Sequence, residues 1–166
     1  MKSMHQHAEH TDEARQSNAG RQHLMAACAA ATDGEFAQAM ELFEGIVNCD
    51  TAVDVRQPEV GMVMMRGRMG GDGAPFNIGE ATVTRAVVRL ETGEIGYSYL
   101  LGRSKQRARM AAILDAIAQS SEERMAKLED GFVAPVAKRA EAARQSQRAE
   151  TEATRVNFFT MVRGDD

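Results

Sequence analysis

Two arginines and a glycine-rich turn form the part of the sequence whose residue types and spacing most suggest chemistry. Arg66 and Arg68 stand two residues apart, so on a strand their side chains point to the same face. Backbone N–H groups of a glycine-rich turn can converge on an anion, and arginine donates paired hydrogen bonds to phosphate or carboxylate. The candidate anion-binding or docking residues, including two arginines from later in the chain, are Arg66, Arg68, Gly70, Gly71, Gly73, Arg85 and Arg103.

The same arginines are also explained by a solvated face that Asp72 and Glu80 balance. None of them supplies a nucleophile, or a base with an evident partner. The residues alone therefore leave two alternatives open, an anion site and an ordinary charged surface.

Other motifs that would indicate an enzyme are missing. The sequence contains no P-loop, no dinucleotide fingerprint, no Gly-x-Ser-x-Gly and no CxxC pair. His5, His7 and His10 are close enough to bind a metal, but histidines on a polar tail bind metals adventitiously. We therefore predict no catalytic residue and no metal site.

Charge and composition limit the class of protein. The net charge is −4 over 166 residues, yet residues 56–109 carry nine basic and five acidic side chains. No apolar run approaches a membrane span, and the N-terminus lacks the apolar core of a secretion signal. Two separated cysteines, Cys28 and Cys49, are not a disulfide framework. The sequence indicates a cytoplasmic protein that does not enter a membrane.

The first third of the chain has a helical period. Residues 1–19 are polar and aperiodic, which predicts a disordered tail before a single domain over 20–166. A helix is expected from Arg21, and a second one from Asp33, which we predict as its N-cap. The second helix repeats large apolar residues at Phe36, Met40 and Phe43.

The period then changes to two. Residues 60–65 are apolar on both faces, which predicts a strand covered on both sides. Residues 81–90 and 95–101 alternate, with a tight turn over 91–94 in which Gly93 takes a positive φ. We predict an α+β fold, an antiparallel β-meander of three or more strands flanked by N- and C-terminal helices.

The remainder of the chain is helical again. Ser104 is a predicted N-cap, residues 108–118 have an apolar face, and Gly131 and Pro135 are expected to interrupt the helices. Residues 137–154 lack a strong apolar stripe, so that helix lies in water or on a partner. An apolar segment closes the chain and predicts an interface, with candidates Phe158, Phe159, Met161 and Val162.

Three stretches carry a resemblance to a known family. They are PEVGMVMMRGRMGGDGAPFNIGEATVTRAVVRL, GEIGYSYLLGRSKQRA and the ending TRVNFFTMVRGDD. Together they resemble the G subunit of the bacterial carbon–phosphorus lyase system, the family of phosphonate metabolism protein PhnG. The resemblance covers about Arg21 to the C-terminus. The family usually has a histidine near the position of Ser98.

The resemblance implies a subunit of a core complex with the H, I and J subunits, two copies of each. With partner subunits it implies support for the transfer of ribose 5-triphosphate from ATP to methylphosphonate, which releases adenine. The complex uses MgATP. The resemblance attributes the nucleosidase chemistry to the I subunit and therefore implies a scaffolding role here, with no cofactor bound by this subunit.

The alternative is a free-standing anion- or nucleic-acid-binding module. The negative net charge and the lack of aromatic residues among the arginines argue against nucleic acid.

Overall fold

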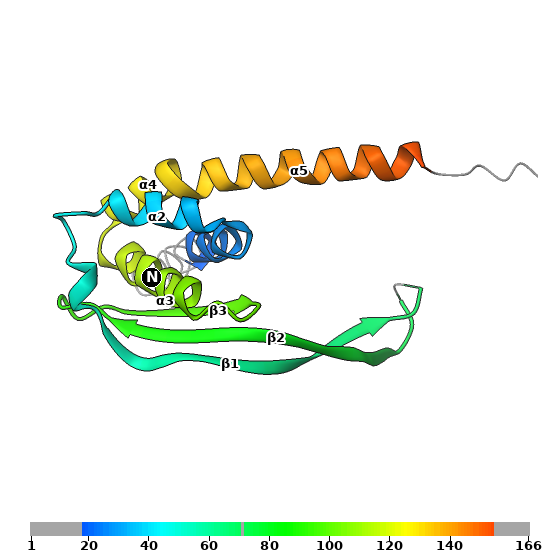
Figure 1. Ribbon diagram of the computed structural model, residues 1–166, viewed down its shortest axis with the longest axis horizontal. Helices are drawn as coiled ribbons and strands as arrows, with labels where there is room; N and C mark the ends of the chain where they lie inside the picture. The colour runs from blue at the N-terminus through cyan, green and yellow to red at the C-terminus, as the bar shows by residue number, and fades with distance from the viewer. Residues whose placement is uncertain (1–17, 71, 155–166) are drawn as a thin grey trace, which may run out of the picture.

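The computed structural model describes residues 18–70 and 72–154, which form one sheet with helices on one of its faces (Figure 1). The sheet has the strands β1 (Val53–Arg68), β2 (Pro75–Arg89) and β3 (Ile95–Leu101) in the order β1-β2-β3. Both neighbouring pairs are antiparallel. The predicted α+β meander with helices before and after it is therefore confirmed.

The helical layer begins with a helix over residues 18–30 and continues with α2 (Asp33–Glu41). After the sheet come α3 (Lys105–Ser120), α4 (Glu122–Leu128), the π-helical turn η2 (Glu129–Val133) and α5 (Ala134–Ala153). Residues 18 and 19, which were predicted as part of a disordered tail, are helical, and the other residues of that predicted tail lie outside the described part. None of the described helices is long and apolar enough to cross a bilayer.

The core lies between the inner face of the sheet and the helices. Helix α3 packs directly on β2 and β3, and Ser104 caps it by accepting a hydrogen bond from the N–H of Arg107 at 3.3 Å. The predicted cap and apolar face of α3 are confirmed. Above α3, the rings of Phe36 and Phe132 meet with 5.8 Å between their centroids. The largest fully buried side chains are Phe36, Phe43, Phe132, Leu24, Ile113, Leu114, Ile117 and Leu128.

The start of α2 corrects one prediction. Thr32, and not Asp33, is the N-cap: its hydroxyl accepts the N–H of Glu35, and the Glu35 carboxylate accepts the N–H of Thr32 at 2.7 Å. This reciprocal capping box satisfies two backbone donors, which Asp33 could not do from the first helical position. Arg139 of α5 also donates to Glu35, at 2.7 Å, and joins the second helix to the last.

The chain from α4 to α5 corrects a second prediction. Gly131 and Pro135 do not interrupt the helix, because the wider π-helical turn η2 precedes Pro135 and places this residue in the first turn of α5. Gly131 packs against Leu42, since a Cβ at this position would lie 2.6 Å from Cδ1 of that side chain. Helix α5 buries Val136 and Ala140 near its start, and its later turns are exposed.

Gly96 is where β3 comes closest to α3. A Cβ at this position would lie 1.9 Å from the carbonyl oxygen of Ala112 and 2.6 Å from the backbone nitrogen of Ala116. Both contacts are to backbone atoms, so no side chain can move aside. The sheet and α3 therefore pack at a distance that only glycine allows.

We expect Gly96→Ala to lower the free energy of unfolding by about 3 kcal/mol or more, because overpacking against rigid backbone forces the helix away. Urea unfolding followed by circular dichroism measures this. Gly79→Ala on β2 is the matched control, since nothing lies within 4 Å of its Cβ position. Equal stability of the two variants would contradict the close packing.

The pair of Glu35 and Arg139 predicts a pH dependence. Hydrogen bonds from Arg139 are the largest cause that lowers the pKa of Glu35 to about 2, followed by those from Thr32 against a desolvation cost. A carboxylate with a lowered pKa stabilises the fold above its unfolded pKa of about 4.3, and this stability is lost as the pH falls toward 2.

Thermal unfolding of wild type and Glu35→Gln between pH 7 and pH 2.5 tests this dependence. We expect the variant to melt at a lower temperature at pH 7 and the difference to shrink below pH 4.5. A difference that does not change with pH would show that the charge of Glu35 is not involved.

Candidate functional site

The most unusual surface is the distal half of the β1–β2 hairpin, which extends beyond the third strand (Figure 1). The last residue of β3, Leu101, pairs with Val83, so the rest of the hairpin is a ribbon of two strands. We call its strand residues, 62–68 and 75–82, the arm. The arm brings together Met62, Met64, Met65, Phe76 and Ile78, all of them exposed.

The arm corrects the prediction that residues 60–65 are covered on both sides. Met62 is 69% exposed and Ile78 is 61% exposed. The described helices pack on the proximal part of the sheet, and no described element covers the apolar side chains of the arm. A ribbon of two strands is marginally stable in water, and monomeric proteins seldom expose such apolar area. The arm has the composition of an interface.

A second exposed apolar area lies on the sheet face away from the helices. The side chains of β3 alternate, and its buried residues Gly96, Ser98 and Leu100 face the helical layer. The other face of the strand carries Ile95, Tyr97, Tyr99 and Leu101, of which Leu101 is 76% exposed. Aromatic residues with a polar tip are enriched in protein interfaces.

The predicted arginine residues are only partly brought together. Arg66 pairs with Asn77 and Arg68 with Pro75 near the end of the arm, and Arg68 donates to the carbonyl of Gly73 at 3.1 Å. Gly70 has a φ of 66° in the turn beside them. Gly71 lies outside the described residues.

The other two arginines lie elsewhere. Arg85 is opposite Glu59, seven residues before Arg66 on β1, and forms an ion pair with it. Arg103 is exposed in the turn that follows β3. These strands have the predicted two-residue period. The register that separates Arg85 from Arg66 cannot be predicted from spacing alone.

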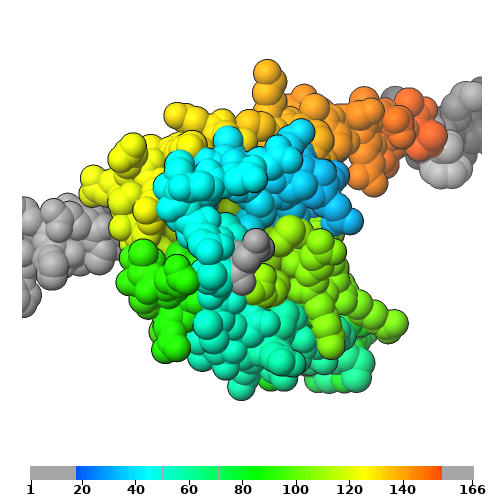
Figure 2. All heavy atoms as spheres, turned by 60° about the vertical axis from the view of Figure 1, so that its left-hand side comes forward, coloured from blue at the N-terminus to red at the C-terminus, as the bar shows by residue number. Residues whose placement is uncertain are grey.

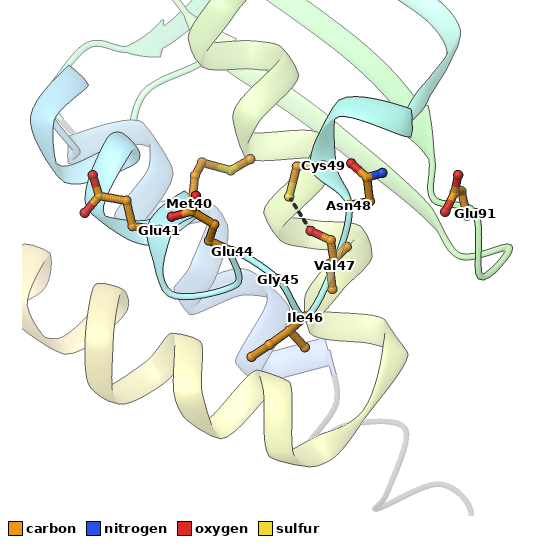
Figure 3. Close-up of a pocket in the computed structure, with 9 residues that line it drawn as sticks. All are labelled: Met40, Glu41, Glu44, Gly45, Ile46, Val47, Asn48, Cys49 and Glu91. Carbon is orange, nitrogen blue, oxygen red and sulfur yellow. Dashed lines mark hydrogen bonds between the residues drawn. The ribbon is translucent and has the colours of Figure 1, made fainter.

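A hollow of about 890 Å³ lies where the chain passes from α2 to β1 (Figure 3). The space-filling view shows this connection running from the helices down to the sheet (Figure 2). Glu41, Glu44 and Glu91 line the hollow and no basic residue does. Three carboxylates repel phosphate and phosphonate, so the hollow does not suit an anionic substrate.

A buried carboxylate that the sequence analysis missed joins three elements. Asp115 of α3 is 1% exposed. It accepts two hydrogen bonds from Arg21 at 2.9 Å each, one from the N–H of Tyr97 at 2.9 Å, and one from Gln119 at 3.1 Å. The hydrogen bond to Asp115 is the largest cause that raises the pKa of Arg21. A charged residue inside the apolar stripe of residues 108–118 was the signal that could have revealed it.

The remaining candidates for a nucleophile or for metal ligands are the side chains of cysteine, histidine, aspartate and glutamate. Burial is the main cause that raises the pKa of Cys28 to about 12, so its thiolate is not formed near neutral pH. Among the described residues, no three His, Cys, Asp or Glu side chains are grouped to hold a metal ion. The predicted interface residues Phe158, Phe159, Met161 and Val162 lie outside the described part of the chain.

The chain is similar to known proteins over most of its length. Residues 19–164 match the family described as phosphonate metabolism protein PhnG. A relative from Rhizobium meliloti (strain 1021) carries the name alpha-D-ribose 1-methylphosphonate 5-triphosphate synthase subunit PhnG. It is 49% identical over 148 residues, which cover 89% of this chain and 92% of that protein.

Asp115 and Arg21 are expected to be strongly coupled. Arg21→Met leaves the buried carboxylate of Asp115 without its ion pair and costs about 3–5 kcal/mol. Asp115→Leu leaves the guanidinium of Arg21, which is 35% exposed and can be hydrated, and replacing both removes the pair together. In a double-mutant cycle of Arg21→Met and Asp115→Leu by urea unfolding, we expect a coupling energy above about 1 kcal/mol. Additive effects would mean that the pair does not hold the three elements together.

Proposed function

We propose, given that the chain belongs to the family of phosphonate metabolism protein PhnG, that it is a subunit of a carbon–phosphorus lyase core complex. In this proposal it supports, together with partner subunits, the transfer of ribose 5-triphosphate from ATP to methylphosphonate with release of adenine. The relative whose name describes a subunit of such a synthase supports this assignment.

The observation that carries the proposal is the exposed arm. Its methionines, phenylalanine and isoleucine have no covering layer among the described residues, which is the state expected of a subunit seen without its partners. Methionine side chains are flexible and adapt to an opposing surface. The proposed role is therefore to join subunits.

The proposed partners are the H, I and J subunits, two copies of each. MgATP and methylphosphonate enter the proposal as substrates of the assembled complex. Arg66 and Arg68 remain candidates for docking a carboxylate of a partner or for contributing to an anion site, because both are exposed at the end of the arm.

Co-expression of the full chain with the H, I and J subunits, followed by size-exclusion chromatography with light scattering, tests the proposal. A stable hetero-oligomer is expected. A monomer that instead retards nucleic acid in a gel would favour the free-standing binding module.

The arm should be required for assembly but not for folding. Met64→Thr with Ile78→Thr removes apolar surface, and we expect recovery with the partner subunits to fall at least about fivefold, since a buried side chain of this kind contributes about 1.5–3 kcal/mol. Circular dichroism should be unchanged.

The matched control is Ile46→Thr with Val53→Thr, two residues that are each 54% exposed and lie outside the arm. We expect this control to assemble like wild type. Equal loss of assembly in both double variants would show that the effect is not specific to the arm.

A further inference from the structure

We infer that the outer edge of β1, from Val60 to Met64, receives an extended segment of a partner subunit as a fourth strand of the sheet. The inference deepens the proposed function and rests on it. It concerns the backbone of β1, whereas the role proposed for the arm depends on its side chains.

The register fixes which backbone groups face this edge. Thr82 faces β3, because its carbonyl accepts the N–H of Gly102 at 2.9 Å. Backbone groups alternate along a strand, so Thr82 and Thr84 face β3, whereas Val83 and Arg85 face β1. The residues of β1 opposite Thr84, Thr82 and Glu80 therefore face away from β2: they are Val60, Met62 and Met64.

The alternation of backbone groups also holds at the outer edge of β3. Tyr97 pairs with Val87, which faces β1, so Tyr97 should face away from the sheet. Its N–H does so and donates to Asp115 at 2.9 Å.

The two edges of the sheet differ in the hydrogen bonds that their outward backbone groups make. At β3, Asp115 accepts the N–H of Tyr97 and Gln119 donates to the carbonyl of Ile95 at 3.0 Å, so side chains of α3 occupy that edge at Ile95 and Tyr97. At β1, no hydrogen bond from a described residue reaches the outward groups of Val60, Met62 or Met64.

Between Glu59 and Arg66, the edge of β1 also lacks the features that usually prevent strand pairing. Proteins blunt exposed edges with charged residues, proline or bulges. Pro58 and two register shifts precede the segment, and a third shift follows it at Met65, but Glu59–Met65 pairs without a break. No charged residue stands between Glu59 and Arg66. An uninterrupted, apolar and unpaired edge is left.

Charge indicates what kind of segment fits. Glu59 at one end is already paired with Arg56 and Arg85. Arg66 at the other end has no ion pair among the described residues. The incoming segment should therefore carry apolar side chains opposite Val60, Met62 and Met64, and a carboxylate opposite Arg66.

A second copy of this chain does not meet that requirement. Two copies that pair antiparallel about a two-fold axis place residue i opposite residue j with i + j even. Registers centred from Gly61 to Met65 place opposite Arg66 one of Arg56, Pro58, Val60, Met62 and Met64. None of these is acidic, so a partner subunit fits better than a copy.

Proline substitution tests the use of the edge backbone. Met62→Pro removes an outward N–H and leaves the β1–β2 ladder intact, whereas Met62→Ile keeps the N–H and an apolar side chain. In co-purification of the full chain with the H, I and J subunits, we expect Met62→Pro to be recovered at least about tenfold less than wild type, and Met62→Ile within about twofold. Val63→Pro removes an inward N–H and should instead damage the hairpin.

Equal recovery of wild type and a folded Met62→Pro would overturn the inference and leave the proposed function standing. Failure of wild type to co-purify would instead contradict the proposed function.

Hydrogen exchange of the wild-type chain gives a second readout that does not depend on the folding of the proline variant. Amides of Val60, Met62 and Met64 should exchange rapidly in the free chain and at least about a hundredfold more slowly in the complex. Protection in the free chain that rises with concentration would assign the edge to a second copy. Protection independent of concentration would assign the edge to another segment of the same chain, and either result would overturn the inference, as would rapid exchange in the complex.

Discussion

The ionic contact between Asp115 and Arg21 organises the molecule, because it is made where three elements meet. Arg21 comes from the helix over residues 18–30, Asp115 from α3, and Tyr97 of β3 donates its backbone N–H to the same carboxylate. A carboxylate that is 1% exposed needs all of these donors to offset its loss of water. The contact joins the helix over residues 18–30 and α3 to β3, and it occupies the edge of β3 at Tyr97. No described residue makes such a contact with the edge of β1 between Val60 and Met64.

Two further constraints explain why the apolar arm is exposed. Gly96 lets β3 lie directly against α3, so the helix covers the sheet where β3 is present. β3 ends opposite Val83, whereas β1 and β2 continue beyond that point. Helix α3 and the third strand therefore stop near the same place (Figure 1), and the remaining hairpin carries apolar residues on strands that no described element covers. This geometry is consistent with a protein whose sheet is completed by another chain.

Much of the fold could be predicted from the sequence, because it depends on local patterns. The change of period located the strands, Gly93 marked the tight turn with a φ of 104°, and Ser104 marked the start of α3. The covering of residues 60–65 could not be predicted, because apolar residues on both faces are equally expected of a buried strand and of an interface. The distance between Arg85 and Arg66 depends on strand register, and the role of Asp115 depends on contacts 94 residues apart in the chain. The partners in such long-range contacts are set by packing, so a local pattern can single out Asp115 as unusual but cannot name Arg21 as its partner.

The most direct test of this account is a cryo-electron microscopy structure of the chain assembled with the H, I and J subunits. The account predicts a fourth strand, contributed by another subunit, beside Val60–Met64, with the N–H and C=O of Met62 in hydrogen bonds between chains. It also predicts that the side chains of the arm are buried in the complex. A complex in which the edge of β1 and the arm both face solvent would contradict the account.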